Sequence, residues 1–124
     1  MPEHFYSVDE ANALIPKLRP LLERIRATQA ELAADKTVVL VKEKAAHNGG
    51  GQPGPHLSEL QQRLERDLRQ LSESGIVLRD PSIGLIDFFH QRDGETVFLC
   101  WKLGEKNVEW WHPVETGIAG RQRL

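Results

Sequence analysis

Residues 84–112 read GLIDFFHQRDGETVFLCWKLGEKNVEWWH and carry the clearest structural signals in the chain. It holds all three tryptophans, three of the four phenylalanines and the only cysteine. Asp93-Gly94, between two apolar runs, is a strong two-residue hairpin signal, because both central positions of such a turn need positive φ. Residues 104–107 form a looser second turn, and the flanking aromatic and aliphatic runs are typical of strands. The stretch therefore predicts a three-stranded antiparallel meander. Its strands are expected at 85–90, 96–103 and 108–112.

A two-residue loop at Asp93-Gly94 fixes the register of the first hairpin. It pairs Arg92 with Glu95 and places Asp87 opposite Cys100. Because side chains alternate along a strand, one face of the meander is almost wholly apolar and should meet the helices. The other face mixes apolar and polar residues, and we call it the mixed face. Its expected members are Leu85, Asp87, Phe89, Phe98, Cys100, Lys102, Trp110 and His112.

The second loop leaves the position of His112 open. An odd number of loop residues places His112 opposite Cys100 and makes a row of Asp87, Cys100 and His112 across the sheet. An even number places Trp111 opposite Cys100 and breaks the row, because a shift of one residue turns every side chain to the other face. The sequence allows both registers.

Composition and charge limit the class of protein. The chain has 124 residues, which suits a single domain. A formal net charge of −2 argues against nucleic acid and anionic membranes as partners. One cysteine fits a reducing compartment, the first residues lack a secretory signal pattern, and the longest apolar run, 38–41, is too short to span a bilayer. We therefore expect a cytoplasmic protein with no nucleic-acid or membrane partner.

The first half of the chain predicts a long helix. Ser7 and Glu10 form a capping box, in which each side chain bonds the backbone amide of the other residue. Apolar residues then recur at helical spacing, and we expect one helix from Ser7 to about His47. Residues 37–41, TVVLV, are also typical of a strand. A short edge strand within 36–47 is therefore the alternative.

A second helix follows a flexible loop. Residues 48–55, NGGGQPGP, are rich in glycine and proline and predict a loop. Leucines at helical spacing predict a helix over 56–74, which Gly75 ends in the left-handed conformation, and 76–80 read as a short strand. The fold class is therefore α+β in one domain, 1–124. A long antiparallel helical hairpin (7–74) is followed by a small antiparallel sheet of three to four strands and a C-terminal tail (75–124).

The unequal lengths of the two helices favour a dimer. At about 1.5 Å per residue, a helix over 7–47 is roughly 60 Å long and one over 56–74 roughly 28 Å. The second helix covers only part of the first, so the leucine stripes offer more apolar surface than one chain can hide. Surface of this kind usually contacts another subunit. We expect a homodimer built mainly on the helices.

The chain also resembles the domain-of-unknown-function family 2203, small prokaryotic proteins without an assigned activity. The matching segments are 6–16 (YSVDEANALIP), 84–88 (GLIDF), 99–105 (LCWKLGE), 111–112 (WH) and 117–122 (GIAGRQ). The resemblance covers nearly the whole chain and implies an N-terminal helical region followed by a small β region. It implies no catalytic residue. The family commonly has proline after Asp-Phe, where this chain has Phe89-His90, so any role of His90 would be particular to this protein.

The mixed face carries the candidate site. Carboxylate, thiolate and imidazole groups bind transition metals, so Asp87, Cys100 and His112 are candidate metal ligands. A cysteine nucleophile would also need an accessible thiolate, but Cys100 lies between Leu99 and Trp101 and is expected to be structural. We predict no catalytic residue.

The C-terminal tail is expected to fold across the mixed face. A buried carboxylate needs a cationic partner, so Arg121 should pair with Asp87 or Glu105. Asp87, His112 and Arg121 would then form one polar cluster. The candidate ligand-binding residues are Asp87, Glu105, His112 and Arg121.

The sequence thus favours a homodimeric interaction or regulatory module. The alternative is a small-ligand or transition-metal-binding protein that uses the mixed face. The sequence names no cofactor, ligand or protein partner.

Overall fold

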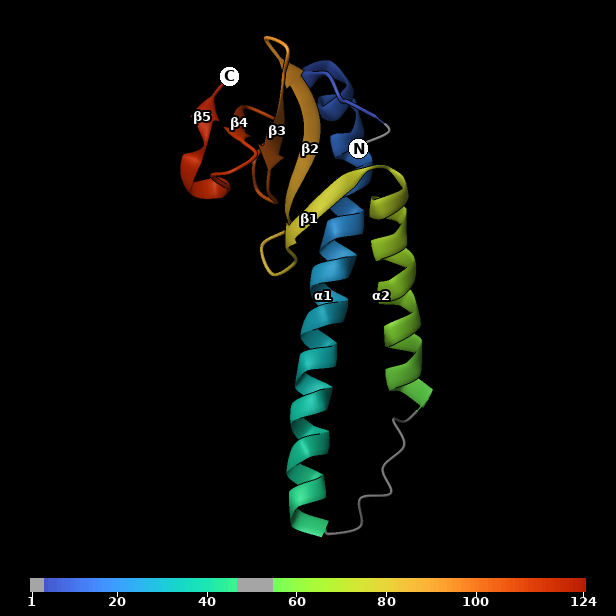
Figure 1. The fold of residues 1–124 in the computed structure, drawn as a ribbon. Helices are drawn as coiled ribbons and strands as arrows, with labels where there is room; N and C mark the ends of the chain where they lie inside the picture. Colours follow the sequence, from blue (N-terminus) through green and yellow to red (C-terminus); the bar gives the residue numbers. More distant parts are fainter. Residues whose placement is uncertain (1–3, 47–54) are drawn as a thin grey trace.

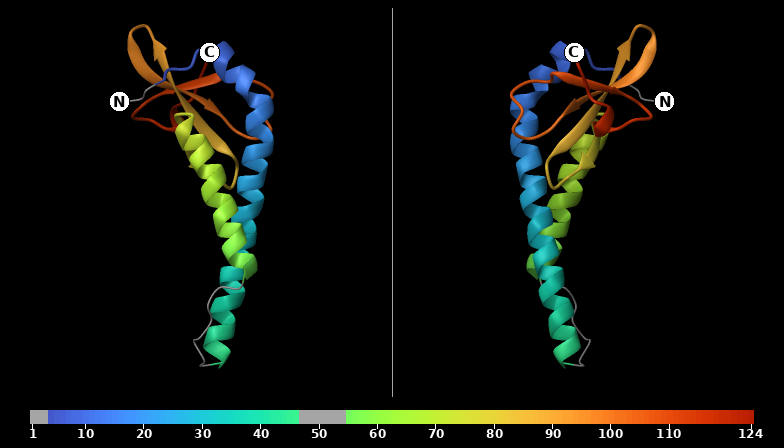
Figure 2. Two further views of the ribbon diagram at one scale, coloured as in Figure 1. Left: turned by 90° about the vertical axis from the view of Figure 1, so that its right-hand side faces the viewer. Right: turned by 90° about the vertical axis from the view of Figure 1, so that its left-hand side faces the viewer.

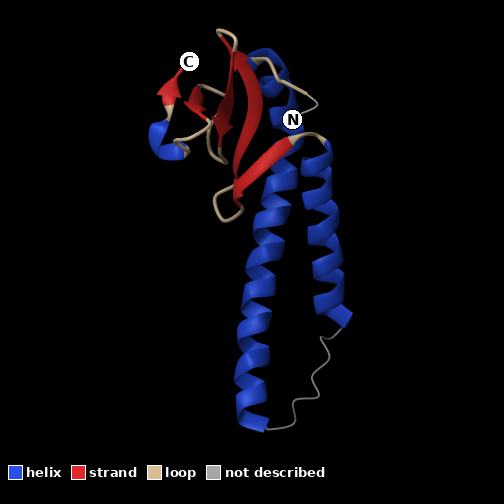
Figure 3. Ribbon diagram, in the orientation of Figure 1, coloured by secondary structure: helices blue, strands red, loops and turns tan. Residues whose placement is uncertain are grey.

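The computed structural model describes residues 4–46 and 55–124, with side chains described for 4–34 and 58–124. Two helices, α1 (Val8–Ala46) and α2 (Pro55–Glu73), lie side by side as a hairpin, and a five-stranded antiparallel sheet packs at one end of it (Figures 1 and 3). The fold is α+β, as predicted. The sheet strands are β1 (Ile76–Asp80), β2 (Leu85–Arg92), β3 (Glu95–Trp101), β4 (Trp110–Pro113) and β5 (Gln122–Arg123).

The prediction of three to four strands was wrong by one. Strands β1 to β4 lie in the segments that the sequence indicated, and they pair in chain order. The additional strand, β5, comes from the C-terminal tail after a short 3₁₀ helix, η1 (Ile118–Gly120). It pairs with β4, with Trp110 opposite Arg123. A two-residue strand of polar residues has no alternating apolar pattern, so the sequence contains no signal for it.

Helix α1 begins at the predicted capping box. The amide of Glu10 donates to Ser7 Oγ at 3.0 Å, and the amide of Ser7 donates to Glu10 Oε1 at 3.0 Å. The helix continues through residues 37–41 to Ala46, so the alternative of an edge strand there is wrong. His47 and the predicted loop residues 48–54 lie outside the described part of the chain.

The register of the first hairpin is the predicted one. Arg92 pairs with Glu95 and Asp87 pairs with Cys100. Asp93 and Gly94 have φ values of 51° and 80°, as a two-residue turn of this kind requires. The turn chemistry alone was enough to place every side chain of β2 and β3 on the correct face.

The second hairpin differs from both predicted registers. Trp110 lies opposite Cys100, and His112 lies opposite Phe98. His112 is therefore on the mixed face, as expected for an odd second loop. It lies beside Phe98, two residues along β3 from Cys100. The reason is the long connection between Trp101 and Trp110, which is tied to α1. Within it, the Val108 amide donates to Asn12 Oδ1 at 2.7 Å.

The apolar face of the sheet packs on the helices and forms the core (Figure 1). Ile86, Phe88, Leu99 and Trp101 are completely buried there against residues of both helices. Over its described residues, neither helix has an apolar segment suited to crossing a membrane. The mixed face is turned away from the helices, and the tail containing η1 and β5 folds back beside it.

Gly84 supplies a first test of this packing. Its φ is +63°, and a Cβ atom built there would lie 2.5 Å from Leu103 Cγ. Gly84→Ala should lower the free energy of unfolding by about 3 kcal/mol, since a left-handed non-glycine residue and an overpacked contact each cost about 1–3 kcal/mol. Urea unfolding followed by circular dichroism measures the loss.

Gly94→Ala is the matched control for this substitution. Gly94 has a φ of +80° but no atom within 4 Å of an added Cβ, so its variant carries the backbone strain alone. Equal losses in the two variants would contradict the close contact between Gly84 and Leu103.

Candidate functional site

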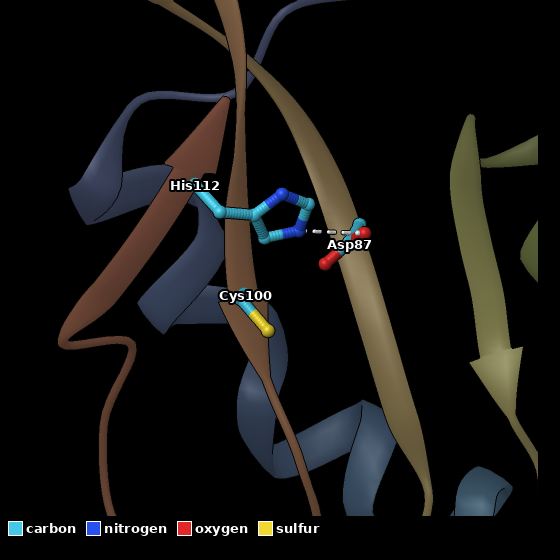
Figure 4. Close-up of side chains that lie close together, drawn as sticks. All are labelled: Asp87, Cys100 and His112. Carbon is cyan, nitrogen blue, oxygen red and sulfur yellow. Dashed lines mark hydrogen bonds and ion pairs between the residues drawn. The ribbon is translucent and has the colours of Figure 1, made fainter. Parts of the chain in front are cut away.

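Three potential metal ligands meet on the mixed face. Asp87 comes from β2, Cys100 from β3 and His112 from β4, and their side chains converge (Figure 4). A carboxylate oxygen, the thiol sulfur and an imidazole nitrogen all lie within 4.8 Å of one another. Each of the three residues is about 1% exposed. We call this group the triad.

Asp87 is the centre of the triad's polar contacts. Its Oδ2 atom accepts from Arg79 Nε at 2.7 Å and lies 3.0 Å from His112 Nε2. Its Oδ1 atom is buried and has no hydrogen-bond partner within the described residues. A buried carboxylate oxygen without a partner is costly, so the triad has one unused acceptor.

The backbone fixes the orientation of His112. Its Nδ1 atom lies 2.8 Å from the carbonyl oxygen of Pro113. A carbonyl only accepts, so Nδ1 carries a hydrogen and donates it. The other ring nitrogen, Nε2, then faces Asp87. Nε2 lies 3.0 Å from Oδ2 of Asp87 and is the atom that points into the triad (Figure 4).

Cys100 is a buried free thiol. Burial first, and then the negative charge of Asp87, raise the thiol pKa from 9.0 to about 12, although the positive charge of Arg121 acts in the opposite direction. Any hydrogen bond from the thiol to Asp87 is weak, since the carboxylate's Oδ1 has no partner at normal hydrogen-bond length in the described structure. The thiol is protonated at neutral pH and is a poor nucleophile.

Glu105 and Arg121 form a separate ion pair. Arg121 Nη2 lies 2.7 and 2.8 Å from the two carboxylate oxygens of Glu105, and its guanidinium packs over Trp110 at 5.0 Å. The predicted cluster of Asp87, His112 and Arg121 is therefore only partly correct. Asp87 and His112 are in contact, but the partner of Arg121 is Glu105.

The cation beside Asp87 is Arg79, which the sequence analysis missed. Val77 pairs with Asp87 across β1 and β2, and the register shifts between Leu78 and Asp80, where Arg79 lies. The bond from Arg79 to Asp87 shows that its side chain is on the mixed face. Its guanidinium lies over the Phe98 ring at 4.8 Å. Alternation along 76–80 does not place Arg79 by itself, because an irregularity in the pairing of β1 with β2 interrupts it at this residue.

An open cleft of about 420 Å³ lies elsewhere, between α1 and the turn after β1. Its lining residues are Arg26, Gln29, Ala30, Ala33, Asp80, Pro81 and Ser82. None of the triad residues lines it, and the only ionisable groups in the lining are Arg26 and Asp80. The group of possible metal ligands therefore lies away from this cleft.

Comparison with known proteins gives a family but no activity. Residues 4–124 match the family described as "Uncharacterized conserved protein (DUF2203)". No curated protein and no solved structure matches the chain.

Proposed function

We propose a function from the site itself, because the chain belongs to DUF2203, a family described only as uncharacterized. The protein binds one divalent transition-metal ion through Asp87, Cys100 and His112. The observation that supports this is the convergence of three different donor atoms, from three adjacent strands, within 4.8 Å of one another.

The donor set and its spacing suit Zn²⁺ or a similar ion. Donor atoms around a tetrahedral zinc lie about 3.3–3.7 Å apart, given bond lengths of about 2.0–2.3 Å. The shortest contact of the triad, 3.0 Å between His112 Nε2 and Asp87 Oδ2, is slightly shorter than this, and the widest separation is 4.8 Å. Shifts of about an ångström would therefore admit the ion. One sulfur, one nitrogen and one oxygen donor favour zinc over magnesium or calcium.

The surroundings already contain the supporting contacts of a metal site. The Pro113 carbonyl holds the hydrogen on Nδ1 of His112, which is the usual way in which a backbone group orients a ligating histidine. Arg79 holds the carboxylate of Asp87 from the solvent side. The ion would bind Nε2 of His112 and one carboxylate oxygen of Asp87, whose Oδ1 atom has no other partner in the described structure.

Two features work against binding, and the metal removes the second of them. The guanidinium of Arg79 is positive, and the Cys100 thiol must lose its proton. A divalent ion bound to a thiol lowers its pKa enough to deprotonate it. With Asp87 and Cys100 both anionic, the charge of the ion is neutralised inside the site.

Cobalt titration tests this proposal. Tag-free protein stripped with a chelator should bind one equivalent of Co²⁺ and show a thiolate-to-cobalt charge-transfer absorption, and Zn²⁺ should displace the cobalt. Cys100→Ser should abolish the absorption. Asp87→Asn and His112→Ala should each weaken Co²⁺ binding by about tenfold or more, which corresponds to about 1.4 kcal/mol.

His4→Ala is the control for adventitious binding. His4 is half exposed and pairs with Glu10 on the surface, so its loss should leave the titration unchanged. Absence of the charge-transfer absorption in the wild type, or equal cobalt binding in Cys100→Ser, would refute the metal site.

A second candidate function is a homodimeric interaction module. The observation that favours it is the length of α1, about 58 Å against about 28 Å for α2 at 1.5 Å per residue. The last turns of α1 extend past the N-terminal end of α2 (Figure 2). On α2, Leu68 is 36% exposed, while Leu60 and Leu71 of the same stripe are buried.

Light scattering tests the second candidate. A dimer has twice the 14.1 kDa mass of the chain, and Leu68→Asp should shift the equilibrium towards the monomer, because it places a charge in an apolar contact. Gln61→Asp, at an exposed position of the same helix, is the control. A mass of one chain across a wide concentration range would exclude the dimer.

A further inference from the structure

We infer, on the premise that the proposed metal site is correct, that the ion's fourth ligand is an oxyanion, a carboxylate or phosphate group of a small molecule, and that Arg79 recruits it. Three protein donors leave one position of a tetrahedral ion open, as in catalytic rather than structural zinc sites. The inference concerns what occupies that position.

The fold determines the side on which the open position lies. Asp87, Cys100 and His112 project from β2, β3 and β4 on the same face of one sheet (Figure 4). An ion held by all three lies above that face, so its remaining position is directed away from the sheet. The helices cover the opposite face. The triad is itself almost fully buried, so an anion would reach the ion past the partly exposed side chain of Arg79.

Arg79 is the exposed group that borders the triad. Its side chain is 43% exposed, whereas that of Asp87 is 1% exposed. Nε is bonded to Asp87, and the guanidinium rests on the Phe98 ring. The two terminal nitrogens have no hydrogen-bond or ion-pair partner among residues 4–34 and 58–124, whose side chains the structure describes. They form a fixed pair of donors of the kind that binds carboxylates and phosphates in a bidentate way.

Charge makes an anion the preferred ligand. A divalent ion with the anionic forms of Asp87 and Cys100 and a neutral His112 has no net charge, and Arg79 then leaves the site with one positive charge. The charge of Arg121 is already balanced by Glu105, both of whose carboxylate oxygens contact its Nη2 atom. One oxygen of the ligand would bind the open position of the ion. A second oxygen would accept hydrogen bonds from the terminal nitrogens of Arg79.

Anion titration of the cobalt-loaded protein tests the inference. Inorganic phosphate and acetate are added separately at saturating Co²⁺, and the visible cobalt spectrum is recorded. We expect a saturable change with at least one of them, and the anion that binds more tightly identifies the phosphate or the carboxylate class. Arg79→Met should weaken the binding of that anion about tenfold. Arg79→Lys keeps the positive charge but not the bidentate guanidinium, so its affinity for the anion should lie between those of the wild type and Arg79→Met.

Arg92→Met is the matched control. Arg92 also lies over an aromatic ring, that of Trp111 at 4.5 Å, but it is at the far end of the hairpin. Its loss should not alter anion binding, and unchanged circular dichroism shows that each variant is folded. If cobalt binds but neither anion changes its spectrum, or if Arg79→Met binds them equally well, the inference is wrong while the metal site stands. If cobalt does not bind at all, the metal site and this inference both fail.

Discussion

Native, metal-free protein should react with iodoacetamide at Cys100 about fiftyfold or more slowly than the same chain unfolded in urea at neutral pH. Raising the pKa from 9.0 to about 12 reduces the thiolate fraction about a thousandfold. The more basic thiolate is about twentyfold more nucleophilic, so the alkylation rate falls by less than the thiolate fraction does. Burial of the sulfur, with Cys100 1% exposed, slows the reaction further. Mass spectrometry of timed samples measures both rates.

The pH profile gives the sharper form of this test. Cys100 is the only cysteine, so alkylation reports on a single site. In the native protein the rate should rise about tenfold per pH unit without levelling off below pH 11, whereas in the unfolded chain it should level off near pH 9. A native rate that levels off near pH 9 would show an ordinary, accessible thiol.

The same pKa predicts a loss of stability in alkali. Below about pH 9 the thiol is protonated in both the folded and the unfolded chain, so it adds no pH dependence. Between about pH 9 and about pH 12 the unfolded chain releases the proton while the folded chain retains it. The free energy of unfolding therefore falls as the pH rises through this range. Cys100→Ser, which does not titrate there, should lack this component.

The two hairpins show how far the sequence can determine the register of a sheet. Asp93-Gly94 specifies a two-residue turn, and local chemistry was sufficient to pair Asp87 with Cys100. The second connection is set by tertiary contacts. Arg19 donates to the carbonyl oxygens of Glu105 and Lys106, and Asn12 accepts from the Val108 amide. Contacts between residues about 90 positions apart leave no local pattern, so the register of β4 could not be predicted.

The sequence could predict which potential ligands meet at the candidate site, but not which charged residues pair there. The two-residue alternation of strands placed Asp87 and Cys100 on one face, and His112 with them if the second loop has an odd number of residues. The structure brings all three together. The sequence allowed Arg121 to pair with either Asp87 or Glu105. Strand pairing of β1 instead brings Arg79 to Asp87 and leaves Arg121 beside Glu105. Which of two arginines reaches a buried carboxylate depends on the order of strands in space.

Replacing His112 by leucine should lower the free energy of unfolding of the metal-free protein by about 3–5 kcal/mol, as the breaking of a buried pair does. His112 and Asp87 are both 1% exposed and lie 3.0 Å apart. The variant leaves the carboxylate with Arg79 as its only partner, and that partner is partly hydrated. Denaturant unfolding in the presence of a chelator measures the loss. His90→Leu is the control, because His90 contacts a backbone carbonyl, that of Tyr6, and no acid; it should cost about 1 kcal/mol.

The cause of that loss can be separated from a simple packing defect by a second substitution. If the cost arises from a carboxylate left without its partner, Asp87→Asn in the His112→Leu background should recover about 1–3 kcal/mol, because it removes the stranded charge. In the wild-type background the same substitution should destabilise the protein, since it weakens the contacts to both Arg79 and His112. A change of sign between the two backgrounds is therefore the expected result. If Asp87→Asn is equally harmful in both, the two residues do not act together, and the polar contacts of the triad have been assigned incorrectly.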